Sequence, residues 1–132
     1  MFKITLLSLF TLVSILGTSD SDFEKSKIRG QIIYTNNCAS CHLAQGQGMA
    51  GAFPPLAKSD YLVKTPAKAV RAIKYGLMGA ITVNGTKYDS MMPEAGLTDA
   101  ETADVMNYIL NAWGNKNPKM MTEKMVADTK PE

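Results

Sequence analysis

Two cysteines and a histidine stand together in this chain, as Cys38-Ala39-Ser40-Cys41-His42. Thiols at this spacing can add to the two vinyl groups of a haem and tether it by thioether bonds. The imidazole after the second thiol can then act as an axial ligand of the iron, as in the attachment motif of c-type haem. The chain has 132 residues with one His and two Cys, so the motif uses all of them. The sequence therefore predicts one covalent haem c, bound by Cys38, Cys41 and His42.

Three other uses of this motif agree less well with the chain. A redox-active Cys-x-x-Cys dithiol is expected after a strand, in a thioredoxin-like context. Structural zinc is typically held by four nitrogen or sulfur ligands, and the chain supplies three. A disulfide across two intervening residues would constrain almost no loop entropy.

The second axial ligand is expected to be a methionine, the next common choice after histidine. Met91 and Met92 lie about fifty residues after His42. Pro93 favours an extended backbone in the residue before it, so we predict a stiff strap that presents Met92 rather than Met91. The alternative is that both only pack. The other methionines are too near His42 (Met49), expected to pack (Met78, Met106) or in an unanchored tail (Met120, Met121, Met125).

The first residues have the pattern of a secretory signal peptide. Met1-Phe2-Lys3 is a charged start, Ile4 to Leu16 is an apolar run, and Gly17-Thr18-Ser19 places small residues at a cleavage position. The run is shorter than the roughly 20 residues that span a bilayer. We therefore predict that residues 1–19 are removed and that the protein is exported to the periplasm, not membrane-spanning after cleavage. An uncleaved anchor is the alternative.

A mostly helical domain over residues 20–114 is predicted to carry the motif. One helix covers residues 22–34, capped by Ser21 or Asp20. A glycine- and proline-rich loop over residues 44–55 follows the motif. A second helix begins at Thr65-Pro66 and ends at Gly76 or Gly79. Asn84-Gly85, flanked by residues 81–83 and 86–88, predicts a minimal β-hairpin.

The last helix is predicted from a capping box, Thr98-Asp99-Ala100-Glu101. An apolar stripe follows it to Trp113, and Gly114 is expected to stop the helix. Residues 115–132 are mostly polar, and we expect them to form a flexible tail. Gly30 lies inside the first helix, where glycine costs about 1 kcal/mol relative to alanine. Its presence indicates that another backbone passes close by.

Charge is uneven along the chain, although the formal net charge is only +2. Residues 61–88 contain no Asp or Glu, whereas residues 89–104 contain no Lys or Arg. The basic stretch could steer an acidic partner. Nothing in the sequence indicates nucleic-acid binding. The basic residues are Lys64, Lys68, Arg71, Lys74 and Lys87.

Further motifs stand along residues 30–115. They are Gly30 with Tyr34, Gly46-x-Gly48, Phe53-Pro54-Pro55-Leu56, Val83-Asn84-Gly85, Met92-Pro93, Leu97-Thr98-Asp99, Tyr108-Ile109 and Trp113-Gly114-Asn115. Together with Cys-x-x-Cys-His, they make the chain resemble a class I cytochrome c of the bacterial monohaem group. The resemblance implies an all-α cytochrome c fold whose terminal helices cross through Gly30, Tyr34 and Tyr108. It also implies that the carbonyl of Pro54 accepts a hydrogen bond from His42 and so orients its ring.

The resemblance implies an electron carrier rather than an enzyme, with His42 and Met92 as the axial iron ligands. Its partners would be redox proteins such as an oxidase, a reductase or a dehydrogenase, met in a weak and salt-sensitive encounter. One alternative is a haem subunit held permanently in a larger oxidoreductase complex. Another is a small-molecule sensor or weak peroxidase whose methionine leaves the iron readily.

Overall fold

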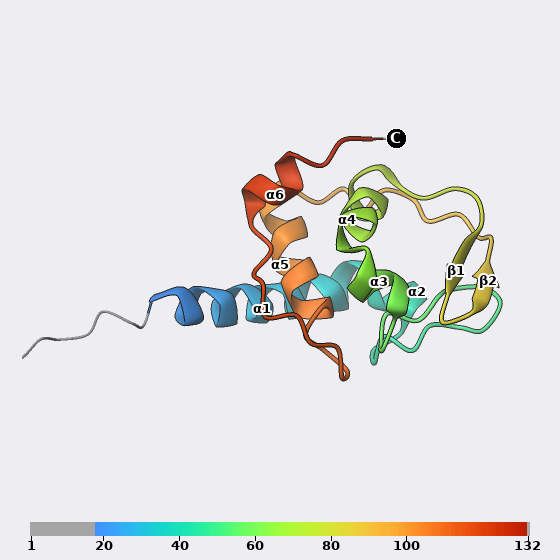
Figure 1. Ribbon diagram of the computed structural model, residues 1–132, viewed down its shortest axis with the longest axis horizontal. Coiled ribbons are helices and arrows are strands. Elements are labelled where there is room, and N and C mark those ends of the chain that lie inside the picture. The colour runs from blue at the N-terminus through green and yellow to red at the C-terminus, as the bar shows by residue number, and fades with distance from the viewer. Residues whose placement is uncertain (1–17, 132) are drawn as a thin grey trace, which may run out of the picture.

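The computed structural model describes residues 18–131, which are mostly helical with one short sheet, as predicted (Figure 1). Residues 1–17 of the expected signal peptide lie outside the described residues. Within the described part, no helix is long and apolar enough to cross a bilayer. The elements are α1 (Thr18–Asn37), α2 (Ala39–His42), α3 (Asp60–Lys64), α4 (Pro66–Tyr75), β1 (Ile81–Val83), β2 (Thr86–Tyr88), α5 (Asp99–Ile109) and α6 (Glu123–Ala127).

Helices α1 and α5 cross at Gly30, as its position inside a helix predicted (Figure 1). A Cβ atom built at Gly30 would overlap the backbone of Asp104 and lie 2.8 Å from the Cβ of Tyr108. Only glycine therefore lets the two helices approach this closely. Helix α1 is longer than predicted, and Ser21 lies inside it rather than capping it. No glycine or proline lies between Thr18 and Asp22 to interrupt the helical hydrogen bonds there.

Three aromatic rings pack where α1 meets the end of α5. The ring centroid of Tyr34 lies 5.7 Å from that of Tyr108 and 4.9 Å from that of Trp113. The prediction that α5 continues to Gly114 is wrong, because the helix ends at Ile109. Trp113 has a φ of 53°, and this turned backbone brings its ring onto Tyr34.

The middle of the chain follows the predicted order. Helix α4 begins at Pro66 and is capped by Gly76, whose φ is 79°. The hairpin pairs Ile81 with Tyr88, and its two turn residues both have positive φ, as the Asn-Gly signal requires. Helix α3 was not predicted; Ser59 caps it by accepting a hydrogen bond from the backbone N–H of Leu62.

The C-terminal tail, which was expected to be flexible with at most one loosely docked turn, packs on α5 in the structure. Met121 and Val126 are buried, and the short helix α6 forms in this segment. The side-chain amide of Asn107 donates to the carbonyl of Met121 at 2.9 Å and accepts from its N–H at 2.7 Å. A polar composition concealed this order, since a few well-spaced apolar side chains and hydrogen bonds from α4 and α5 dock the segment.

Candidate functional site

The haem-attachment motif begins where α1 ends. The N–H of Cys38 still donates to the carbonyl of Tyr34 at 2.9 Å, and the N–H of His42 donates to the carbonyl of Cys38 at 3.0 Å. The single turn of α2 thus presents both cysteines and His42 from one short, hydrogen-bonded segment. Both cysteines are free thiols; Cys38 is half-buried and Cys41 is exposed.

Tyr34 fixes the end of this segment. Its hydroxyl donates to the carbonyl of Leu43 at 2.6 Å, and Leu43 has a φ of 63° that turns the chain away from α2. Burial raises the pKa of Tyr34, so the phenol remains a protonated donor. The aromatic cluster at the helix crossing is therefore connected directly to the motif.

The ring of His42 is oriented by Pro54. Nδ1 of His42 lies 3.0 Å from the carbonyl oxygen of Pro54, so the hydrogen bond implied for this proline is present. When Nδ1 carries the proton, it donates this bond and leaves Nε2 with a lone pair for a metal. Burial lowers the pKa of His42, opposed in part by the Pro54 carbonyl. Burial therefore favours the neutral imidazole that metal ligation requires.

Gly48 allows the loop to return to His42. Its N–H donates to the carbonyl of His42 at 3.0 Å, and its φ is +64°. A Cβ atom here would overlap the carbonyl of Phe53 and lie 2.7 Å from the carbonyl carbon of Pro54. The predicted irregular loop is thus a close backbone turn that carries the acceptor for His42.

The backbone of Met92 forms two hydrogen bonds with Leu77, just after the end of α4. Its N–H donates to the carbonyl of Leu77 at 2.9 Å, and its carbonyl accepts from the N–H of Leu77 at 2.8 Å. Gly76 permits this approach, since a Cβ atom there would lie 2.9 Å from the carbonyl oxygen of Met92. Met92 is partly buried, whereas Met91 is 67% exposed. Of the two adjacent methionines, Met92 is the one that faces the interior.

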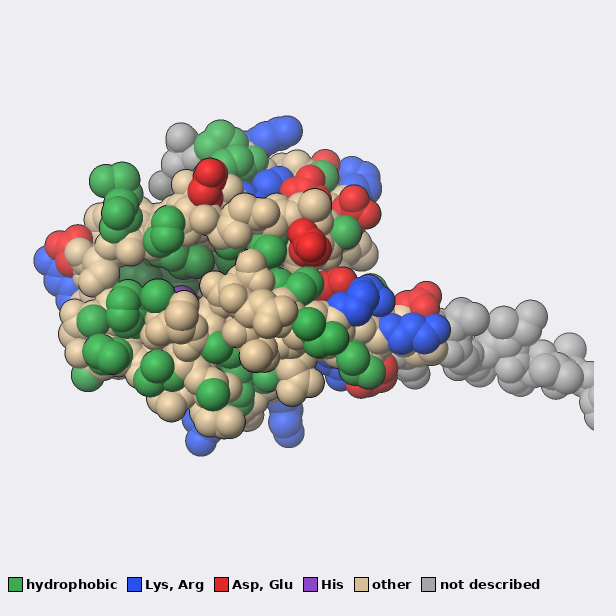
Figure 2. All heavy atoms as spheres, turned by 180° about the vertical axis from the view of Figure 1, so that it is seen from behind, with side chains coloured by type: hydrophobic (Ala, Val, Ile, Leu, Met, Phe, Trp, Pro, Cys, Tyr) green, Lys and Arg blue, Asp and Glu red, His purple; other side chains and the backbone are tan. Residues whose placement is uncertain are grey.

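Two apolar cavities adjoin both His42 and Met92. One is lined by Cys38 and the other by Cys41. None of the described residues that line them is Lys, Arg, Asp or Glu. Figure 2 shows the hollow in the surface, with hydrophobic side chains around it and the colour of the single histidine inside.

The donor set of this hollow fits haem c. An imidazole and a thioether are side chains that ligate haem iron, and each of the two thiols at the attachment spacing borders one of these cavities. The sequence profile of the family described as Cytochrome c matches residues 28–113.

The chain belongs to the cytochrome c family.

Relatives of this cytochrome include proteins named cytochrome c-552 and a cytochrome c subunit of an alcohol dehydrogenase. It is 44% identical over 91 residues to cytochrome c-552 of Thermus thermophilus, covering 65% of this chain and 69% of that protein. For a second cytochrome c-552 from the same species, the same identity covers 61% of the relative. It is also 34% identical over 101 residues to the cytochrome c subunit of alcohol dehydrogenase (quinone) from Gluconacetobacter polyoxogenes. That match covers 74% of this chain but only 21% of the subunit.

Membership of this family makes the chain a class I c-type cytochrome with covalent haem c. Its general role is to carry electrons, and it is not itself an enzyme. The predictions of family, fold class and cofactor from the sequence are thereby confirmed.

Several features of the site were not predicted from the sequence. Leu77 was missed as the partner of Met92, because no local pattern links the two residues. Met78 was expected to pack but is 81% exposed, whereas Met121, expected to lie in an unanchored tail, is buried. Both errors arise because exposure depends on which distant segment covers a side chain. The basic stretch is also partly neutralised, since Lys74 pairs with Asp99 at 2.8 Å.

Proposed function

We propose that this cytochrome carries single electrons in the periplasm with His42 and Met92 as the axial ligands of its haem iron. The observation that carries the proposal is that both residues border both apolar cavities. When bound, the haem supplies a one-electron ferric–ferrous couple. Cys38 and Cys41 would tether it by thioether bonds.

The chain holds each ligand residue by the backbone of another segment. Pro54 orients the His42 ring, and Leu77 holds the backbone of Met92. Backbone contacts of this kind would keep both side chains in one place in either oxidation state, which lowers the reorganisation that accompanies electron transfer. The apolar lining excludes water from the same space.

Redox partners would dock over the rim of the hollow. Met91, which lines the second cavity, is 67% exposed, and hydrophobic side chains surround the opening in Figure 2. Flexible methionines suit a surface that meets more than one partner. An apolar rim also favours a brief contact that depends less on salt than the basic stretch alone would suggest.

Absorption spectra test the ligand assignment. The protein is expressed with c-type haem maturation machinery, and the weak far-red band of methionine sulfur on ferric haem is recorded. Met92→Ala should abolish this band and Met91→Ala should retain it, because only Met92 is held toward the interior. A band that survives Met92→Ala would refute the assignment. The N-terminus of the protein from a periplasmic fraction, expected at Asp20, tests export separately.

A second candidate function is a haem subunit of a larger oxidoreductase. Its support is the similarity to proteins named as alcohol dehydrogenase (quinone) cytochrome c subunits, together with Ile28 and Ile32 on α1. These two side chains are 61% and 60% exposed and lie one helical turn apart, as a lasting contact surface would require. Co-purification with a partner at high salt would favour this function, whereas a monomer under those conditions would favour the free carrier.

A further inference from the structure

Lys74 lies where three segments of the chain meet. Its Nζ atom is 2.8 Å from a carboxylate oxygen of Asp99 and 2.9 Å from the carbonyl oxygen of Val126. Its side chain is only 13% exposed. Lysine normally keeps its ammonium in water, so this inward placement needs the two oxygen partners that it has.

The segment 92–99 is attached at three points to α4 and the residues directly after it. At its start, Met92 pairs with Leu77 through two backbone hydrogen bonds. In its middle, the N–H of Ala95 donates to the carbonyl of Ile73 at 2.9 Å. At its end, Asp99 pairs with Lys74. Of these three contacts, the one between Lys74 and Asp99 is made by side chains. A substitution of Lys74 therefore removes this contact without changing the backbone.

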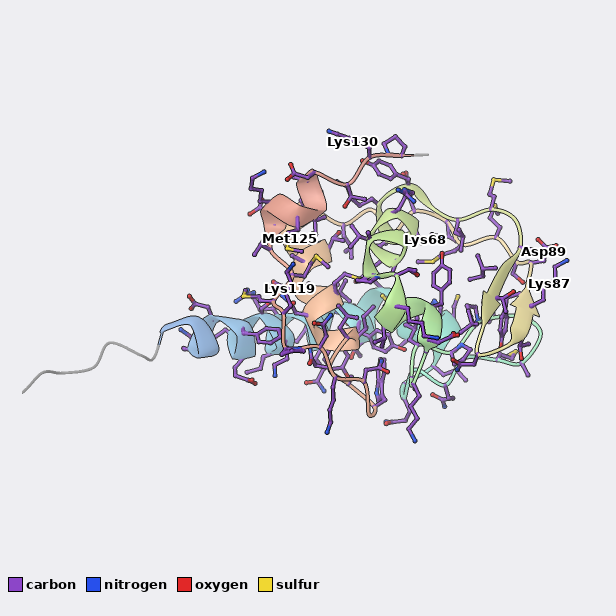
Figure 3. The ribbon with its side chains drawn as sticks, viewed as in Figure 1. Lys68, Lys87, Asp89, Lys119, Met125 and Lys130 are labelled. Atoms are coloured by element: carbon purple, nitrogen blue, oxygen red, sulfur yellow. The ribbon has the colours of Figure 1, made fainter. Side chains whose placement is uncertain are left out.

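The C-terminal tail covers the same end of α4. Besides Lys74, the hydroxyl of Tyr75 donates to the carbonyl of Thr129 at 3.0 Å, and Nε of Arg71 donates to the carbonyl of Lys130 at 3.0 Å. Figure 3 labels Lys130 at the outer edge of the tail, above α4. Of Arg71, Lys74 and Tyr75, it is Lys74 that also contacts α5, through Asp99.

We propose that Lys74 is a positioning residue for Met92. By holding Asp99 and Val126 together on α4, it keeps the 92–99 segment against Leu77 and so restrains the methionine side chain at the haem site. The inference rests on the proposed ligation by Met92. Without the ammonium, the far end of the segment would lose its attachment to α4, and the methionine would leave the iron more often.

The test uses competition by imidazole on the haem-loaded ferric protein. Lys74→Met keeps an unbranched apolar stem but removes the charge, and Met92 then competes less well with added imidazole. We expect the apparent affinity for imidazole to rise about tenfold, in line with the loss of a charged hydrogen bond. The far-red methionine band should weaken at the same time. Lys74→Arg should restore both signals, because a guanidinium can reach the same oxygens.

Lys68→Met is the matched control, since Lys68 is an exposed lysine on the same helix (Figure 3). It should leave imidazole affinity unchanged. Asp99→Asn provides a second variant of the same contact, which keeps the measurement available if Lys74→Met does not load haem. It should raise imidazole affinity in the same direction.

Two results would overturn the inference. In the first, Lys74→Met and Asp99→Asn each lower the free energy of unfolding while imidazole affinity stays at the wild-type value; Lys74 would then be structural only. In the second, Lys68→Met raises the affinity equally, which would indicate a general charge effect. Met92→Ala separates these failures from that of the proposed function. If it leaves the far-red band intact, the ligation is wrong; if it abolishes the band, only the role of Lys74 is in question.

Discussion

The contact between His42 and Pro54 decides which imidazole nitrogen is available to a metal. Nδ1 is committed to the carbonyl oxygen at 3.0 Å, so Nε2 is the nitrogen that remains. Donation from Nδ1 also makes the ring a stronger ligand. The effect depends on Gly48, whose positive φ and lack of a side chain bring the carbonyl into place.

Gly48→Ala is expected to raise the reduction potential. The new Cβ would push away the carbonyls of Phe53 and Pro54, and a weaker His42 ligand stabilises ferric iron less. We expect a rise of about 60 mV, which for one electron corresponds to a tenfold change in equilibrium. Protein-film voltammetry measures it. Gly51→Ala is the control, because its φ is +76° but a Cβ there meets nothing within 4 Å; an equal rise in that variant would contradict the explanation.

At the scale of elements, the crossing of α1 and α5 is held by a buried polar cluster beside Gly30. The carboxylate of Asp104 accepts from the hydroxyl of Ser26 at 2.6 Å and from Nε of Arg29 at 2.6 Å. The hydrogen bond to Asp104 raises the pKa of Arg29, so the guanidinium stays charged. Backbone contact at Gly30 and this cluster together set the position of the two helices.

Gly30→Ala should destabilise the haem-loaded protein by about 1–3 kcal/mol, the usual cost of overpacking. The added methyl group cannot avoid the backbone of Asp104 without separating the helices. Denaturant unfolding followed by haem absorbance measures the loss. Gln31→Ala, at an exposed neighbouring position, should change stability little; a similar loss there would show that the crossing is not the cause.

The docking of the C-terminal tail on α5 depends on the two hydrogen bonds between Asn107 and Met121. Asn107→Ala removes both partners of the Met121 backbone, and unsatisfied buried groups cost about 1–3 kcal/mol each. We expect a loss of about 2 kcal/mol in unfolding free energy and faster proteolysis between residues 115 and 131. Asn36→Ala, exposed on α1, provides the control. Unchanged proteolysis in Asn107→Ala would mean that other contacts hold the tail.

At the scale of the whole molecule, charge and apolar surface are separated. The hollow opens through an apolar rim (Figure 2), while part of the basic stretch on α4 is occupied by Asp99 and by carbonyls of the tail. The net charge is only +2. Contact over the rim should therefore be governed by apolar surface more than by long-range attraction.

Electron self-exchange between two copies of this cytochrome tests that expectation without an external partner. Its rate, measured by NMR on mixed ferric and ferrous protein, should vary little with salt. Met91→Lys should slow exchange about tenfold at low salt, because two like charges would meet at the rim, and added salt should restore much of the rate. Met125→Lys on α6 (Figure 3) is the control, and equal slowing in it would argue against docking over the rim.

The sequence by itself determined the features that are encoded within a few adjacent residues. The spacing of Cys38, Cys41 and His42 specifies the attachment chemistry, since it depends only on neighbours in the chain. Thr98 and Glu101 form the predicted capping box, and the Asn-Gly turn forms the predicted hairpin. Gly30 indicated a close approach of backbones, and the family resemblance identified the last helix as the partner.

Only the tertiary structure decided the features that depend on distant partners. Leu77 meets Met92 and Lys74 meets Val126, although no local pattern links the members of either pair. The docking of the tail through Asn107 and Met121 has the same origin. The physical reason is that burial and hydrogen-bond pairing are properties of segments brought together by folding, so one residue's environment is set by sequence far from its own.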